Sequence, residues 1–191
     1  MQFNEGSFYH IYNRGNNKQR IFFSTNNYRF FLNKVERYIS PNCDILSWAL
    51  MPNHFHFLVR ANEKTIELIK HTPIEINALT EGIRLLLSSY TKAIQKQEKL
   101  SGNLFQQKTK AKCVDDYCTI AFHYIHQNPL KARLAKKLEA WEFSSFREYL
   151  SKSDRSLCAT EIAYEYLDIE PANFVADSHK VISDDLAREL F

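Results

Sequence analysis

The chain has 191 residues, a mass of 22.5 kDa and a formal net charge of +3, which suits one compact domain or a domain with an appendage. With 45% hydrophobic and 14% aromatic residues, it can form a core, unlike a disordered chain. No apolar run approaches the roughly 18 residues that cross a bilayer, and the first residues lack the pattern of a secretory signal, so we expect a soluble, cytoplasmic protein. The four cysteines form no CxxC pair and predict neither a structural zinc site nor a disulfide framework.

The first sixty residues predict three strands and a helix. Residues 7–13 are aromatic and β-branched, as in a strand, and residues 14–18 read as a loop. Ser24 or Thr25 can cap a helix that extends to about Ile39. Residues 44–50 and 54–60 then predict two strands, and the short turn between them predicts an antiparallel hairpin.

The next eighty residues predict two longer helices around one more strand. Residues 61–79, which include Pro73, predict loop and a short helix. An apolar stripe predicts a helix over residues 81–99, and residues 105–114 predict a fourth strand. Residues 115–127 predict another helix, which Asn128 and Pro129 interrupt before a helical stretch over residues 130–138. This order predicts an α+β, ferredoxin-like (split βαβ) antiparallel sheet with helices on one face.

The pair His54 and His56 stands on the third predicted strand. Residues two apart on a strand point to the same face, so both imidazoles would project together while Phe55 points into the core. Two neighbouring neutral imidazoles are suited to a divalent metal, although a third ligand must come from elsewhere. The alternative interpretation is a pair of packed or surface histidines, because an isolated His-x-His pattern is common.

Tyr124 and Asn128 are four residues apart, so they share one face of a helix that reaches Asn128. That face could bring a tyrosine hydroxyl beside a metal held by His54, His56 and the Asn128 side-chain oxygen. Tyrosine can act as a covalent nucleophile, but its free pKa of about 10 means that it needs activation. Tyr117, two turns earlier, is a second candidate nucleophile. Three neighbours could replace Asn128 as a ligand: His123, His126 and Gln127.

Several segments together resemble one enzyme family. Residues 9–15 (YHIYNRG), 48–59 (WALMPNHFHFLV) and 124–132 (YIHQNPLKA) are similar to the HUH single-tyrosine transposases, and most of all to the REP-associated tyrosine transposases. Residues 101–106 (SGNLFQ) and 141–146 (WEFSSF) also resemble that branch. The similar segments lie between about Tyr9 and Tyr149, in the same order as in that family and at plausible spacings.

The resemblance implies a ferredoxin-like core that cuts single-stranded DNA, often next to a hairpin, with magnesium or manganese. It implies that Tyr124 attacks the phosphodiester and becomes linked to the 5′ phosphate, and that a 3′ hydroxyl later reverses the reaction. By the same resemblance, His54, His56 and Asn128 are the metal ligands. Because imidazoles are softer than the all-oxygen shell that magnesium prefers, we expect manganese to work at least as well.

Basic residues are concentrated in the middle of the chain. Residues 84–138 contain eleven Lys and Arg but three Asp and Glu, whereas residues 139–191 contain five and twelve. A basic section of this kind suggests a polyanion partner such as nucleic acid, although a basic helix face that is merely solvated has the same sequence pattern. Tyr12 and Phe105 could stack on unpaired bases. The candidate DNA-binding residues are Arg14, Lys18, Arg20, Arg84, Lys108, Lys110, Lys112, Lys131 and Arg133.

The domain prediction divides the chain at about residue 150. Residues 1–150 carry the resemblance and are predicted to form the catalytic domain. Residues 151–191 are predicted to be an acidic, helical or irregular C-terminal extension, loosely attached. Two other functions stay open from the sequence: a metal-dependent nuclease that uses water, and an inactive module that binds structured nucleic acid. The sequence also leaves open a monomer or a homodimer.

Overall fold

The computed structural model describes residues 1–71, 74–153 and 156–191; the predicted loop residue Pro73 lies outside this range. Its centre is a four-stranded sheet in the order β2-β3-β1-β6, and each neighbouring pair is antiparallel. The strands are β1 (Phe8–Arg14), β2 (Asp44–Met51), β3 (His54–Arg60) and β6 (Lys110–Cys113). With helix α1 (Thr25–Tyr38) after β1 and helix α3 (Ala78–Glu98) before β6, the order of elements confirms the ferredoxin-like prediction.

The two faces of the sheet carry different side chains because successive residues of β1 and β3 point to opposite sides. Phe55 points toward the helices and lies 5.4 Å from Phe31 of α1 between ring centroids. His54 and His56 point to the other face, where Tyr12 is the register partner of His56. One face therefore contributes an aromatic core, and the other presents polar rings.

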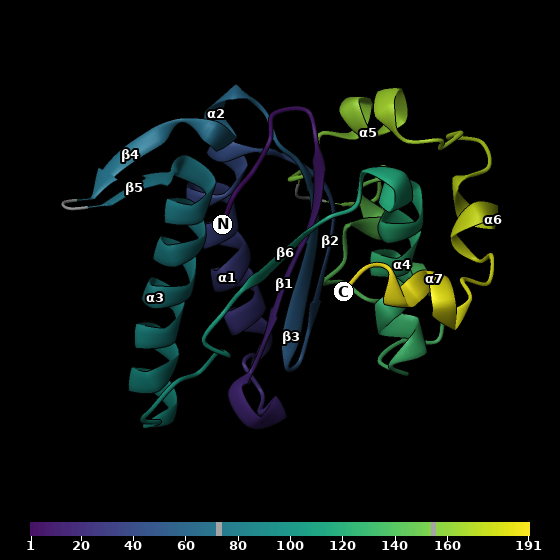
Figure 1. Ribbon diagram of the computed structural model, residues 1–191. Helices are drawn as coiled ribbons and strands as arrows, with labels where there is room; N and C mark the ends of the chain where they lie inside the picture. The colour runs from purple at the N-terminus through teal and green to yellow at the C-terminus, as the bar shows by residue number, and fades with distance from the viewer. Residues whose placement is uncertain (72–73, 154–155) are drawn as a thin grey trace.

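Helices cover both faces, which corrects the prediction of helices on one face. Figure 1 shows α1 and α3 on one side of the sheet and α4 (Cys118–Lys131) on the other, where it contacts β2 and β3. The buried face of α4, which includes Ala121, Phe122 and Ile125, needs an apolar surface to cover. Since every residue of β2 after Asp44 is buried, on both sides of the strand, β2 supplies much of that surface.

Three predicted segments differ from the observed ones. Helix α4 runs through Pro129 and ends at Lys131, because a proline in the last turn removes only one hydrogen bond; the predicted helix over residues 130–138 is wrong. The fourth strand is shorter than predicted and begins at Lys110. The segment over residues 61–79 contains the predicted short helix, α2 (Glu63–Ile66), but in place of loop it also contains the hairpin of β4 (Leu68–His71) and β5 (Ile74–Asn77), which extends from the body in Figure 1.

The C-terminal segment is closely packed, contrary to the expected loose attachment. It contains three short helices: α5 (Thr160–Tyr166), which contacts β2, and α6 (Phe174–Ser178) and α7 (Asp184–Arg188), which lie beside α4 in Figure 1. Phe174 and Leu190 are fully buried and belong to the hydrophobic core. Glu148 also fixes the start of this segment, because its carboxylate accepts hydrogen bonds from the backbone N–H groups of Leu157 and Cys158. The division at residue 150 stays a prediction.

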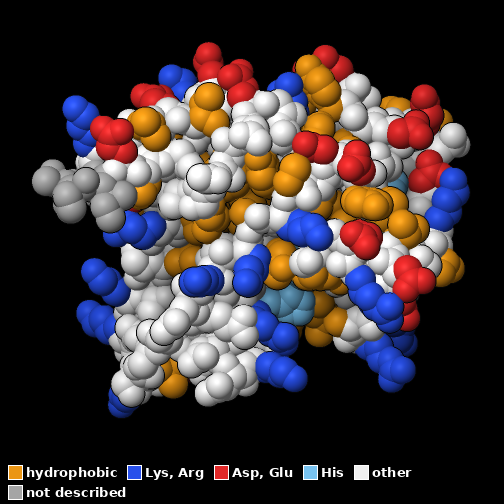
Figure 2. Space-filling view, viewed as in Figure 1, with side chains coloured by type: hydrophobic (Ala, Val, Ile, Leu, Met, Phe, Trp, Pro, Cys, Tyr) orange, Lys and Arg blue, Asp and Glu red, His pale blue; other side chains and the backbone are white. Residues whose placement is uncertain are grey.

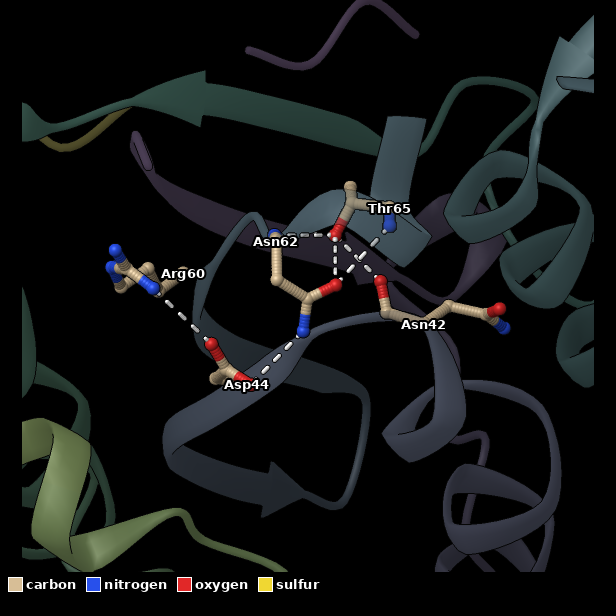
Figure 3. Close-up of polar contacts among 5 residues, drawn as sticks. All are labelled: Asn42, Asp44, Arg60, Asn62 and Thr65. Carbon is tan, nitrogen blue, oxygen red and sulfur yellow. Dashed lines mark hydrogen bonds and ion pairs between the residues drawn. The ribbon is translucent and has the colours of Figure 1, made fainter. Parts of the chain in front are cut away.

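A polar network closes the end of the β2–β3 pair that lies farthest from the turn at residues 52–53 (Figure 3). Asp44 accepts a hydrogen bond of 3.0 Å from Asn62 and forms an ion pair of 3.6 Å with Arg60. Asn62 caps α2, and the Thr65 hydroxyl donates to the Asn42 carbonyl oxygen. These contacts fix this end of the two strands and the turn at residues 52–53 closes the other, so the position of the histidines on β3 is determined.

Short 3₁₀ turns connect several of these elements: η1 (Asn16–Lys18), η2 (Ser40–Asn42), η3 (Asp115–Tyr117), η4 (Leu138–Ala140) and η5 (Ser145–Arg147). Of the helices in the described part of the chain, none is long and apolar enough to cross a membrane.

Candidate active site

His54 and His56 project from the sheet face that α4 partly covers. Their ring centroids lie 5.0 Å apart and their planes are perpendicular, as expected for residues two apart on a strand. His56 is 3% exposed, whereas His54 is half-buried. The turn before His54 is held by the Gly15 N–H, which donates to the Asn53 carbonyl oxygen at 2.7 Å. The sequence prediction that both rings share one face is therefore confirmed.

The ring nitrogens of His54 have distinct roles because of Asn53. The Asn53 side-chain nitrogen donates to the Lys18 carbonyl oxygen at 3.3 Å, so its amide oxygen is the atom that lies 2.6 Å from His54 Nδ1. An oxygen of this kind only accepts, so His54 Nδ1 carries the proton. The lone pair of neutral His54 is then on Nε2, the nitrogen available to a ligand.

Burial keeps both histidines uncharged at neutral pH. Desolvation, with a smaller contribution from the nearby Arg14 charge, lowers the pKa of His54 to about 4. Desolvation also lowers the pKa of His56 well below its ordinary value, with smaller contributions from His10, His54 and Arg14. Neutral imidazole is the form that binds a metal ion. The site thus offers two lone pairs without a competing proton.

Tyr124 and Asn128 lie on the face of α4 that turns toward these histidines. The Tyr124 ring lies 6.3 Å from the His56 ring, centroid to centroid, in a perpendicular arrangement. The Asn128 side-chain nitrogen donates to the Tyr124 backbone oxygen at 3.2 Å, which leaves the amide oxygen for another partner. All four predicted residues line one cavity of about 280 Å³. The structure therefore brings together the residues that the sequence suggested as a unit.

The Tyr124 hydroxyl is protonated at neutral pH. Burial raises the pKa of Tyr124 above its ordinary value, and a hydrogen bond with the Asn128 side chain opposes this effect. The Lys131 ammonium lies 5.3 Å from the centroid of the Tyr124 ring. A nucleophilic role for Tyr124 thus requires a further positive charge near the oxygen when it reacts.

The predicted DNA-binding residues separate into two groups. Arg14, Lys108 and Lys110 line the cavity itself, and Lys112, the neighbour of Lys110 on the same face of β6, donates to the Phe191 oxygen at 3.5 Å. Figure 2 shows basic side chains around a histidine surface, while acidic side chains lie mainly along the upper and right edges. The structure thus concentrates positive charge where the histidines reach the surface.

The other basic candidates lie outside the cavity lining. Lys18 and Arg20 are exposed in the loop after β1, and Arg133 follows α4. Arg84 lies on α3, where it forms an ion pair of 2.6 Å with Glu81, and it lines a different groove. Of the two aromatic candidates, Tyr12 lines the cavity; Phe105 is buried in the core and cannot stack on a base.

The alternative residues on α4 point elsewhere. His123 and Gln127 form hydrogen bonds with Ser178 of the C-terminal segment, and His126 bonds to the Ser145 hydroxyl. They occupy the buried side of the helix, whereas Tyr124 and Asn128, one turn apart, occupy the cavity side. Tyr117 precedes the helix and is not part of the cavity lining.

Two residues at this site were missed from the sequence. His10 is fully buried beside His56; its alternation with Tyr12 on a strand is the signal that could have placed it on this face. Phe191 covers the cavity, with its ring 5.0 Å from the Tyr12 ring and 5.7 Å from the Tyr124 ring. No sequence pattern marks Phe191, because its position depends on the path of the whole C-terminal segment.

The donor set fits a divalent ion in part. Within the described ranges, no group of three or more His, Cys, Asp or Glu side chains is arranged to hold a metal ion. The three donors that the sequence predicted, His54, His56 and the amide oxygen of Asn128, all line the cavity, which is of a size to hold water or a phosphate as well. Imidazole and oxygen donors together suit first-row metals such as manganese, and such ions accept water as further ligands.

No protein-family model and no curated protein matches this chain. Among solved structures, the chain is similar to one described as the REP-associated tyrosine transposase bound to a REP hairpin, with a TM-score of 0.60. The two are 16% identical, and the likeness covers 96% of this chain and 97% of that chain. At this level of identity, the likeness shows a shared fold over nearly the whole of both chains.

Proposed function

We propose that the chain is a metal-dependent single-stranded DNA endonuclease and strand transferase, a transposase that acts through a covalent 5′-phosphotyrosine. The observation that carries the proposal is the perpendicular approach of the Tyr124 ring to the His56 ring, 6.3 Å apart, inside one cavity with basic residues at its edge. A nucleophile beside a pair of neutral imidazoles is the arrangement that such chemistry needs. The shared fold with a tyrosine transposase supports the same conclusion.

In this proposal, His54, His56 and Asn128 hold a divalent ion, manganese or magnesium. When bound, the ion would supply positive charge that polarises the scissile phosphate and stabilises the charge that develops in the transition state. The residues themselves keep the site ready: Asn53 orients the His54 ring, and burial keeps both rings neutral.

The proposed reaction balances without a nucleotide cofactor. The Tyr124 oxygen loses its proton to solvent and bonds to phosphorus, while the bond from phosphorus to the 3′ oxygen breaks and that oxygen gains a proton. The products are a 5′ phosphate linked to Tyr124 and a free 3′ hydroxyl. When a 3′ hydroxyl attacks the phosphotyrosine, the phenol leaves and the strand is joined. The phosphotyrosine conserves the energy of the broken phosphodiester.

Single-stranded or hairpin DNA is the proposed partner. The similar structure is described as bound to a REP hairpin, and the basic residues at the edge of this cavity suit a phosphate backbone. Tyr12, half-buried in the cavity wall, can stack on an unpaired base near the cleavage point.

The decisive experiment incubates the protein with single-stranded hairpin DNA, labelled at the 3′ end, and manganese. On a denaturing gel, the wild type is expected to give a covalent protein–DNA band. Tyr124→Phe removes only the nucleophilic oxygen and should abolish the band. Tyr117→Phe is the matched control, because it removes the same oxygen outside the cavity and should retain the band.

Other outcomes would favour the two alternatives. Cleavage that persists in Tyr124→Phe, with no covalent band in the wild type, would indicate a nuclease that uses water. Hairpin binding without cleavage in either metal would indicate a nucleic-acid-binding module. Loss of the band in Tyr117→Phe, but not in Tyr124→Phe, would reassign the nucleophile.

A further inference from the structure

A buried histidine that no sequence prediction included lies behind the His56 ring. His10, on β1, is fully buried, and its Nε2 lies 2.8 Å from His56 Nδ1. The two rings are stacked at 20°, with centroids 5.0 Å apart. One of these two nitrogens must donate and the other accept, since two N–H groups or two lone pairs would repel.

The carbonyl oxygen of Leu190 decides the direction of this hydrogen bond. It lies 2.8 Å from His10 Nδ1, and a carbonyl oxygen only accepts, so His10 Nδ1 carries a proton. His10 is fully buried, and its two partners, a carbonyl oxygen and a second imidazole, carry no negative charge, so the ring is neutral in this setting. Its Nε2 is then an acceptor, and His56 Nδ1 must donate to it. The lone pair of His56 is left on Nε2.

We propose that His10 is a positioning residue that, anchored by the Leu190 carbonyl group, holds His56 in the Nδ1–H tautomer with Nε2 available to the metal. The inference rests on the proposed function, because it concerns how one of its metal ligands is prepared. It gives the two histidines matching states: Asn53 sets the tautomer of His54, and His10 sets that of His56. It also assigns a role to Leu190, which the chain buries completely.

The arrangement has a measurable consequence for metal affinity. A partner that fixes the second nitrogen of a metal-binding histidine orients the ring and raises its basicity, and its loss typically costs roughly 10–100-fold in metal affinity or activity. Without His10, the His56 ring would be divided between two tautomers and two orientations. A histidine that merely filled space could be replaced by an aromatic ring of similar size at no such cost.

The first test reads the tautomer directly and needs no metal and no activity. Long-range ¹H–¹⁵N NMR spectra of the full chain distinguish imidazole nitrogens that carry a proton from those that do not. The metal-free wild type is expected to show His56 with a protonated Nδ1 and an unprotonated Nε2. A protonated Nε2 on His56 would overturn the inference.

The second test measures Mn²⁺ binding by electron paramagnetic resonance. His10→Phe should weaken Mn²⁺ binding by roughly 10–100-fold. His10→Gln, whose amide oxygen can accept from His56, should restore much of it. His123→Phe is the control, because it removes another buried histidine, which is bonded to Ser178 on the side of α4 that faces away from the cavity. Equal Mn²⁺ affinity of His10→Phe and the wild type, with both folded by circular dichroism, would overturn the inference.

The anchor itself is tested by comparing two changes at Leu190 and Phe191. A chain that stops at Glu189 lacks the Leu190 carbonyl group and should show mixed His56 tautomers and weaker Mn²⁺ binding. Phe191→Ala retains that carbonyl group and should keep one tautomer. Unchanged tautomers in the shorter chain would contradict the role of Leu190. The tautomer and the Mn²⁺ affinity can be measured whether or not the protein cuts DNA. Failure of the cleavage assay and failure of this inference are therefore distinguishable.

Discussion

The ring of Phe191 lies 5.7 Å from the ring of Tyr124 at an angle of 77°, so the far end of the described chain rests against the proposed nucleophile. The same side chain lies 6.2 Å from the His56 ring between centroids and belongs to the cavity lining. Phe191 itself is 47% exposed, so it covers the cavity from the solvent side. A phosphate that approaches Tyr124 must therefore share this space with Phe191 or displace it.

Phe191→Ala should make the site more accessible. Displacing a partly buried aromatic ring costs on the order of 1–2 kcal/mol, so removing it should raise the rate of covalent-complex formation by roughly 5–30-fold. Single-turnover assays with hairpin DNA measure this rate. The control is Val181→Ala, which shortens an apolar side chain that is almost fully exposed in the same segment. A slower reaction in Phe191→Ala would mean that the ring assists binding instead.

Removal of the metal should abolish cleavage and leave hairpin binding largely intact. Chelation with EDTA is expected to eliminate the covalent band, and manganese should restore it at least as well as magnesium, because two of the proposed ligands are imidazoles. The comparison requires equal free concentrations of the two ions. A clear preference for magnesium would argue against His54 and His56 as ligands.

Lys110→Gln should weaken DNA binding equally for different sequences. Lys110 lines the cavity and is exposed, so its expected partner is a backbone phosphate. The slope of log affinity against log salt should become shallower by about 1. Lys34→Gln is the matched control, because Lys34 lies on α1, on the opposite face of the sheet, and should leave the slope unchanged. Identical slopes for both variants would remove Lys110 from the interface.

Gly82→Ala should destabilise the fold even though alanine favours helices. A Cβ atom at Gly82 of α3 would overlap the backbone oxygen of Tyr38 at the end of α1, and backbone cannot move aside easily. This overlap outweighs the gain of about 1 kcal/mol in helix propensity, and we expect a net loss of roughly 1–3 kcal/mol in the free energy of unfolding. Urea denaturation measures this loss. Lys96→Ala, an exposed change on the same helix, should have little effect.

Stability should decrease as the pH falls below about 6.5, and His123 should account for part of that loss. Burial lowers the pKa of His123; Asp177 raises it and Lys180 lowers it to a smaller degree, and the ring is also bonded to Ser178. The folded state disfavours the charged form of His123. The contribution of His123 to the free energy of unfolding is therefore present above the unfolded pKa and decreases as the pH falls toward the folded pKa. Each unit of difference in pKa corresponds to about 1.4 kcal/mol.

The measurement compares thermal unfolding of the wild type and His123→Gln between pH 7.5 and pH 5, a window around the unfolded pKa of roughly 6.5. The variant is expected to lose less stability on acidification. A variant that loses as much stability as the wild type would show that His123 is not charged differently in the folded and unfolded states.

Local sequence patterns were sufficient to predict the sheet and the faces on which four residues of the candidate site lie. The predicted bounds of the strand over residues 54–60 agree with β3, because alternation and a turn fix both its ends. The same alternation placed His54 and His56 on one face, and helical spacing placed Tyr124 and Asn128 on another. These are short-range relations, which a single sequence contains. The hairpin of β4 and β5 was missed since each strand has only four residues in a segment of mixed composition.

The sequence by itself determined which residues share a strand face or a helix face, because those relations depend only on the period of each element. Only the tertiary structure decided that α4 covers the face opposite α1 and α3, that His10 bonds to His56, and that Phe191 rests on Tyr124. Leu190 and His10 are 180 residues apart in the chain, and no local period relates such distant positions. Their contact exists because burial of the C-terminal segment against α4 and the sheet brings that carbonyl group to the histidine.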